Sequence, residues 1–239
     1  MTDFLDAIVL LTNYVLVPGV AYGSQLALGA LGVTLIYGIL RFANFAHGDM
    51  MAFGTMVVIL ITWWFQSIGF SIAPLPVALV ALPIGIAAAI VMSLGTDRLV
   101  YRFYRRRRSP SVIYILTSIG VMFVMNGIVR FIIGPDAQRF SAGARVIIKA
   151  REFKQATGLH EGLAIKLSQG ITVLVTLIVV VALFRFLHKS RTGKAMRAYS
   201  DNEDLALLSG INPDRVVMVT WIIVAALAAT AGALYGLDK

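Results

Sequence analysis

The sequence predicts an all-α bundle of about six transmembrane helices. Only 14% of its 239 residues are charged and 59% are hydrophobic, whereas an average soluble domain carries about 25% charged residues. Two long stretches, 7–40 and 50–96, contain no Asp, Glu, Lys or Arg. Because about 20 apolar residues cross a bilayer as a helix, these stretches alone predict several spans.

The first apolar run, residues 7–40, is too long for one straight span and too short for two. Pro18-Gly19 divides it, and proline inside a helix removes a hydrogen bond and clashes with the preceding turn. We therefore expect a break or kink there. The first full span is predicted at 22–40, with 5–17 as an interfacial or half-inserted lead-in.

Five further spans follow from the later apolar runs. The run 50–96 holds two of them, because Gly69, Pro74 and Pro76 mark a connection within it. The last span repeats Ala or Gly every four residues, a spacing that lets helix backbones approach closely in lipid. The predicted spans are 50–66, 77–96, 111–130, 167–185 and 216–236.

Basic residues predict the orientation. Residues 98–108 contain a run of four Arg, 105–108, and no acid, which places loop 97–110 in the cytoplasm. The N-terminus then lies outside and 186–215 lies inside, although the outer segment 131–166 also carries basic residues. The net charge of +9 is thus a signal of topology beside anionic lipid rather than of nucleic-acid binding. The chain has no Cys and hence no thiol chemistry.

The predicted cytoplasmic loop 186–215 contains strong helix boundaries. Ser200 with Glu203 three positions later fits a capping box, which predicts a short helix over about 201–209. Gly210 is expected to end that helix. Asn212 then caps the last span, with Pro213 at its first position. Such a helix could transmit the movement of a partner, or the loop could be an ordinary solvated linker.

One polar interruption, residues 41–49, separates two apolar runs. Its side chains Asn44, His47 and Asp49 admit three interpretations, since polar groups at membrane depth are costly. They line a translocation path, or they cap helix ends and bond to backbone, or His47 and Asp49 relay protons. Too few ligands gather here for a metal. Gln25 and Asn126 are the next candidates for the path, with helix packing as their alternative.

No enzyme constellation is present in the sequence. The P-loop pattern G-x-x-x-x-G-K-[ST] is absent, so the chain is not expected to hydrolyse ATP. The three His, at 47, 160 and 188, are well separated and have no supporting catalytic motif. We therefore predict a non-catalytic protein without a cofactor or metal of its own.

Two stretches carry a resemblance to a known family. Tyr37-Gly-Ile-Leu-Arg-Phe-Ala-Asn-Phe-Ala-His-Gly-Asp49 resembles the segment after the first span of LivH-type permeases of branched-chain amino acid ABC importers. Residues 191–215 resemble the coupling loop of the same family, which docks on ATPase subunits. The resemblance covers nearly the whole chain in the right order. It implies these coupling residues: Ala198, Asp201, Glu203, Leu205, Ala206, Leu208, Gly210 and Ile211.

The resemblance implies a multi-pass permease of the bacterial inner membrane that imports leucine, isoleucine, valine or related small solutes. It also implies partners: a pair of ABC ATPases that use ATP, a second permease of LivM type and an extracytoplasmic solute-binding protein. Urea or short-chain amides are alternative substrates, and a proton-coupled secondary transporter is the alternative mechanism. Family members are longer, so residues 1–239 are expected to form one transmembrane permease domain that lacks C-terminal helices.

Overall fold

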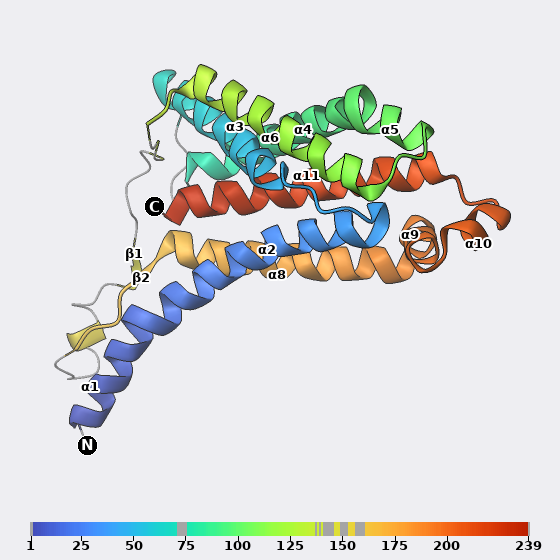
Figure 1. Ribbon diagram of the computed structural model, residues 1–239. Coiled ribbons are helices and arrows are strands. Elements are labelled where there is room, and N and C mark those ends of the chain that lie inside the picture. The colour runs from blue at the N-terminus through green and yellow to red at the C-terminus, as the bar shows by residue number, and fades with distance from the viewer. Residues whose placement is uncertain are drawn as a thin grey trace.

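The computed structural model describes residues 2–70, 76–136, 138, 140, 146–148, 153–155 and 161–238. Within them, six helices are long and apolar enough to cross a membrane, which confirms the predicted all-α bundle (Figure 1). The helices and strands are α1 Thr2–Leu11, η1 Thr12–Leu16, α2 Val17–Leu40, α3 His47–Ser67, α4 Val77–Thr96, η2 Asp97–Tyr101, α5 Arg102–Arg106, α6 Ser111–Ile133, β1 Val146–Ile148, β2 Ile165–Lys166, α8 Leu167–Lys189, α9 Arg191–Asp201, α10 Glu203–Leu208 and α11 Pro213–Asp238.

Of the break or kink predicted at Pro18-Gly19, the break is absent. α1, the π-helical turn η1 and α2 form one continuous helix from Phe4 to Leu40. In η1 the amide of Val17 bonds to the carbonyl of Thr12, five residues back, and this wider turn precedes Pro18 in the first turn of α2. Widening the helix there accommodates the proline ring, so 5–17 continues the span instead of forming a separate lead-in.

The other predicted spans are present with small differences at their ends. α4 has the bounds that the sequence predicted, and α6 and α8 each extend about one turn beyond the predicted end. The two short strands, β1 and β2, pair antiparallel in the segment between α6 and α8. The length of the apolar runs therefore predicts the number of spans correctly but places their last turn less accurately.

Helix α11 forms the centre of the bundle. In Figure 1 it runs between a layer of α2 and α8 and a layer of α3, α4 and α6. Trp221 on α11 is fully buried and stacks on Tyr101 of η2, with ring centroids 5.2 Å apart. A Cβ atom added to Gly54 of α3 would lie 2.6 Å from the Cβ of Ala229. The small residues of the last span thus let α3 and α11 approach closely, as the sequence predicted.

Candidate functional site

The chain turns back on itself between α2 and α3. Arg41 ends α2 in the left-handed conformation, with φ 57°, and residues 41–46 are not helical. At the start of α3 the Nε2 atom of His47 lies 3.1 Å from the carbonyl oxygen of Gly29. Gly29 lies about three turns, roughly 16 Å, before α2 ends at Leu40. Residues 41–46, the re-entrant segment, therefore run back along α2 into the bundle.

Side chains from α6 and η2 satisfy the backbone of the re-entrant segment. The Ser118 hydroxyl of α6 accepts a hydrogen bond of 3.2 Å from the amide of Phe45. The Asn44 side-chain oxygen accepts from the amide of Ala46 at 3.1 Å and from the Tyr101 hydroxyl at 3.2 Å. Irregular backbone at membrane depth is stable where protein surrounds it in this way. The sequence analysis did not select Tyr101 as a partner of this segment.

A cavity of about 600 Å³ opens between α3, α6 and α11. Its wall includes the apolar side chains of Met51, Met56 and Ile59 together with the polar Asn126 and Arg130. The remaining lining residues are Gly48, Ala52, Thr55, Val129, Ile133, Gly134, Pro135, Asp136, Gln138, Gly232, Tyr235 and Gly236. The cavity thus offers a largely aliphatic surface with charged groups of both signs, a common design for small-molecule sites.

The five predicted path residues separate into two groups. The Asn126 side-chain nitrogen donates a hydrogen bond of 2.9 Å to an Asp49 carboxylate oxygen, and Asn126 lines the cavity. In contrast, Gln25, Asn44 and His47 are buried in helix contacts and do not line it. The Gln25 amide reaches the carbonyl oxygen of Leu234 at 3.5 Å. In the part of the chain that the structure describes, no three His, Asp or Glu side chains gather closely enough for a metal.

Arg130 is one of the polar cavity residues that sequence reasoning missed. It lies four positions after Asn126 in α6, so both side chains occupy the same helix face. The four-residue spacing is visible in the sequence and could have placed Arg130 beside Asn126. However, Arg130 stands at the predicted end of a span, where an Arg is usually explained as an interfacial anchor.

The loop between α8 and α11, which the sequence analysis placed in the cytoplasm, contains two short helices rather than the single helix predicted at 201–209. α9 ends at Asp201, and Asn202 caps α10 through a hydrogen bond of 3.0 Å from the amide of Leu205 to its side-chain oxygen. Ser200 is therefore not the cap. Its hydroxyl donates instead to the carbonyl oxygen of Gly38 in α2, at 2.7 Å. Gly210 ends the loop helix with φ 78°, which agrees with the prediction.

The predicted coupling residues differ in exposure. On α10, Leu205 is 61% and Leu208 85% exposed, whereas Ala206 is buried against α9 and α11. α10 therefore presents leucines outward from a firmly packed base. Among the other predicted residues, Ile211 is half-buried and these are exposed: Ala198, Asp201, Glu203 and Gly210.

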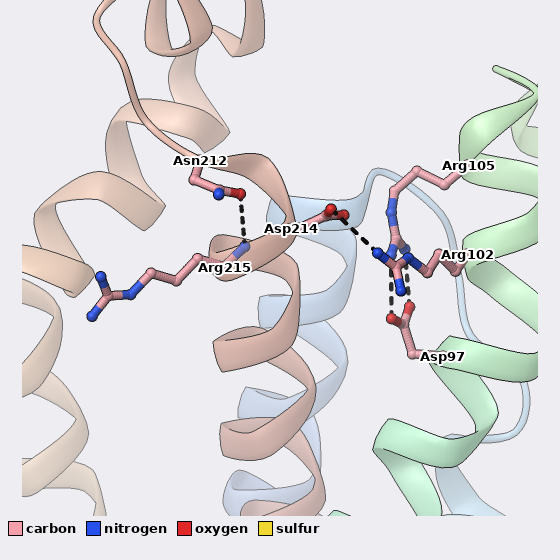
Figure 2. Close-up of polar contacts among 6 residues, drawn as sticks. All are labelled: Asp97, Arg102, Arg105, Asn212, Asp214 and Arg215. Carbon is pink, nitrogen blue, oxygen red and sulfur yellow. Dashed lines mark hydrogen bonds and ion pairs between the residues drawn. The ribbon is translucent and has the colours of Figure 1, made fainter.

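Two ion pairs lie near the start of α11: Arg102–Asp214 connects α11 to the segment after α4, and Asp97–Arg105 lies within that segment. Figure 2 shows Asp214 facing Arg102, with the charged atoms 3.7 Å apart, and Asp97 holding Arg105 through bonds of 2.9 and 3.2 Å. Asn212 accepts a hydrogen bond of 3.3 Å from the amide of Arg215, so it caps α11 as predicted. The Arg102–Asp214 pair and the Asn212 cap thus hold the start of the central helix.

Replacing Arg105 by Ala is expected to destabilise the segment after α4. Asp97 is only 9% exposed, so its carboxylate would stay largely buried without its guanidinium partner. The cost should be about 2 kcal/mol, between values for exposed and fully buried pairs. Thermal unfolding in detergent would measure it as a lowered Tm. The matched control is Arg107→Ala, whose exposed guanidinium only covers the Phe103 ring. Equal Tm values for both variants would contradict the role of the Asp97 pair.

Comparison with known proteins finds permeases. Residues 15–238 match the family described as the permease component of the branched-chain amino acid transport system. The chain is 32% identical over 226 residues to the high-affinity branched-chain amino acid transport system permease protein LivH of Escherichia coli (strain K12); this covers 91% of the chain and 68% of LivH. It is 29% identical over 224 residues to the corresponding BraD of Pseudomonas aeruginosa, covering 93% of the chain and 70% of BraD. No solved structure matches significantly. The family matches confirm the resemblance seen in residues 37–49 and 191–215.

Proposed function

Because the chain belongs to the permease component family of branched-chain amino acid transport systems, we propose that it is the transmembrane subunit of an ABC importer. The observation that carries the proposal is the outward leucine pair of α10, Leu205 and Leu208. Exposed leucines on a short, capped helix outside the membrane-spanning helices need a protein partner to cover them. An ATPase that docks there would supply the energy that this chain does not generate.

The substrate path of this proposal passes through the cavity between α3, α6 and α11. An aliphatic amino acid is a zwitterion with an apolar side chain. Arg130 would attract its carboxylate and the Asp49–Asn126 pair its ammonium group, while Met51 and Ile59 would contact the side chain. This supports leucine, isoleucine or valine over urea or a short-chain amide, since neither of those carries a carboxylate.

The geometry supports path-lining and structural roles over a proton relay. His47 bonds through Nε2 to the carbonyl of Gly29, and Asp49 bonds to Asn126. The two side chains thus point to different partners, and no hydrogen bond joins them in the described part of the chain. Asn44 and His47 hold the re-entrant segment in place, whereas Asp49 bonds to Asn126, which lines the cavity.

The same proposal includes the orientation of the chain in the membrane and its partner subunits. Loop 97–110 and the α9–α10 pair face the cytoplasm of a bacterial cell, with the N-terminus outside the inner membrane. The partners are a pair of ATPase subunits that use ATP, a second permease of LivM type and an extracytoplasmic solute-binding protein. Residues 1–239 act as one permease domain, and 186–215 form its coupling loop.

Uptake into proteoliposomes tests the energy source. The chain, purified with the subunits that accompany it, is reconstituted with the solute-binding protein, and ATP is supplied on the α10 side. Leucine uptake should require ATP and persist when a protonophore removes the proton gradient. Uptake that continues without ATP and stops with the protonophore would reject the proposal in favour of proton coupling. Competition by urea but not by isoleucine or valine would reject the substrate assignment.

Asp49→Leu is expected to raise the KM for leucine about tenfold. The change removes the charged acceptor of Asn126, which lines the cavity, and leaves the Asn126 amide without its partner, at a cost of about 1.5–3 kcal/mol. Transport kinetics at several leucine concentrations measure it. Asp49→Asn is the matched control, because it keeps an acceptor oxygen and should lose less. An unchanged KM in Asp49→Leu would exclude Asp49 from the path.

A further inference from the structure

Two hydrogen bonds join the C-terminal end of α9 to the C-terminal end of α2. The Ser200 hydroxyl donates to the Gly38 carbonyl oxygen at 2.7 Å, and the Arg41 guanidinium donates to the Ser200 carbonyl oxygen at 3.0 Å. Both accepting carbonyls lie in the last turn of their helices, where intrahelical partners are missing. This contact, which we name the Arg41–Ser200 latch, thus gives hydrogen-bond donors to the terminal carbonyls of both helices.

Arg41 is also the first residue of the re-entrant segment. Its backbone turns back into the bundle at φ 57°, an uncommon value for a residue with a side chain, while its guanidinium reaches outward to α9. The next residue, Phe42, is buried and stacks on Tyr114, with ring centroids 5.1 Å apart. A displacement of Arg41 would therefore also displace the segment that leads to His47 and the cavity wall.

α9 and α10 are built to move together. The Tyr199 hydroxyl of α9 donates a hydrogen bond of 2.6 Å to the Glu203 carboxylate of α10. Burial, reinforced by this carboxylate, raises the pKa of Tyr199, so the phenol keeps its proton and remains a donor at any physiological pH. Met196 and Ala206 pack in one apolar cluster beneath the two helices. A partner that pushes on α10 would thus also move Ser200.

We propose that the Arg41–Ser200 latch transmits movement of the α9–α10 pair to the re-entrant segment and so couples the docked ATPase to the cavity; this rests on the proposed function above. Apolar packing between α9 and Ile39 holds the same helices together, but such packing is non-directional and tolerates sliding. The two hydrogen bonds give the contact a fixed direction. Arg41 and Ser200 are therefore positioning residues that touch neither substrate nor nucleotide.

A unique thiol in the re-entrant segment makes its movement measurable. The chain has no cysteine, and the Phe45 side chain is 54% exposed, so Phe45→Cys introduces a single reactive site in this chain, and labelling is read on this chain alone. The assembled transporter carrying this change is treated with a thiol reagent, with and without a non-hydrolysable ATP analogue. The same measurement is repeated with Arg41→Gln and Ser200→Ala added. Arg215→Gln is the matched control, because its guanidinium points away from the ion pairs in Figure 2.

If the latch transmits movement, the ATP analogue should change the rate of thiol labelling at position 45 in the protein with intact Arg41 and Ser200. It should do the same in the Arg215→Gln control. With the latch removed, that change should vanish, and leucine transported per ATP hydrolysed should fall about fivefold or more. Arg41→Lys, which keeps a cationic donor, should restore part of both. An analogue response that persists without the latch, or that is absent with the latch intact, overturns the inference. Failure of the ATPase subunits to copurify with the unaltered chain would instead reject the proposed function.

Discussion

Leu208→Asp on α10 is expected to abolish ATP-driven uptake while the chain stays folded. Leu208 is 85% exposed, so an aspartate there costs the isolated subunit almost nothing. In the assembled transporter the same position would be buried against the ATPase. The variant loses the burial of a leucine, about 1.5–3 kcal/mol, and adds an unpaired carboxylate to the interface. The docking affinity should therefore fall about a hundredfold.

Copurification of the ATPase with the tagged chain measures this effect, together with uptake into proteoliposomes. Leu208→Met is the matched control, because it keeps an apolar side chain of similar volume. A normal Tm for Leu208→Asp would show that the loss is one of docking and not of folding. Normal uptake by the Leu208→Asp transporter would reject α10 as the docking helix.

Gly54→Val is expected to prevent assembly of the bundle centre. A Cβ atom at position 54 would lie 2.6 Å from the Cβ and 2.9 Å from the Cα of Ala229, and backbone cannot give way as a flexible side chain can. Overpacking of this kind costs about 1–3 kcal/mol, and the two further valine atoms add to the clash. We expect little monodisperse protein and a strongly lowered Tm.

The matched control for Gly54→Val lies on α6. A Cβ atom at Gly127 has no other atom within 4 Å, so Gly127→Val should leave both yield and Tm nearly unchanged. Size-exclusion chromatography in detergent and thermal unfolding compare the two variants. If Gly54→Val purified as well as Gly127→Val, α3 and α11 could not pack as closely as described.

The sequence predicted the number of spans because apolar length is a local property that the bilayer demands. The prediction of a helix break at Pro18 failed because of a local feature that is rare. Proline normally interrupts a helix, yet the π-helical turn η1 widens the helix directly before it. Composition does not distinguish a proline that breaks a helix from one that a wider turn accommodates.

The loop helix shows how tertiary contacts decide between equivalent local signals. Ser200 followed by Glu203 and Asn202 followed by Leu205 both place a capping side chain three residues before a backbone amide. Asn202 is the cap because the Ser200 hydroxyl is engaged by Gly38, 162 residues earlier in the chain. The sequence therefore predicted the end of this helix, at Gly210, better than its start.

The candidate site was predictable only in part, since its residues come from distant helices. The intramembrane polar residues Asp49 and Asn126 were recognised because they are costly in lipid; Asn126 lines the cavity, and Asp49 accepts its hydrogen bond. By the same signal Gln25 was selected, although it packs against α11. Polarity at membrane depth thus marks residues with a partner, but only the fold tells whether that partner borders a cavity.

Cross-linking from α10 tests the central proposal most directly. Since the chain has no cysteine, the purified Leu208→Cys chain carries one thiol for a photoactivatable cross-linker and is then assembled with its partner subunits in membranes. We predict a cross-link to the ATPase subunit from position 208 and none from Leu116→Cys, which lies exposed on the membrane-spanning helix α6. Labelling of position 208 by an impermeant reagent added outside intact cells, with no cross-link to an ATPase, would contradict the account.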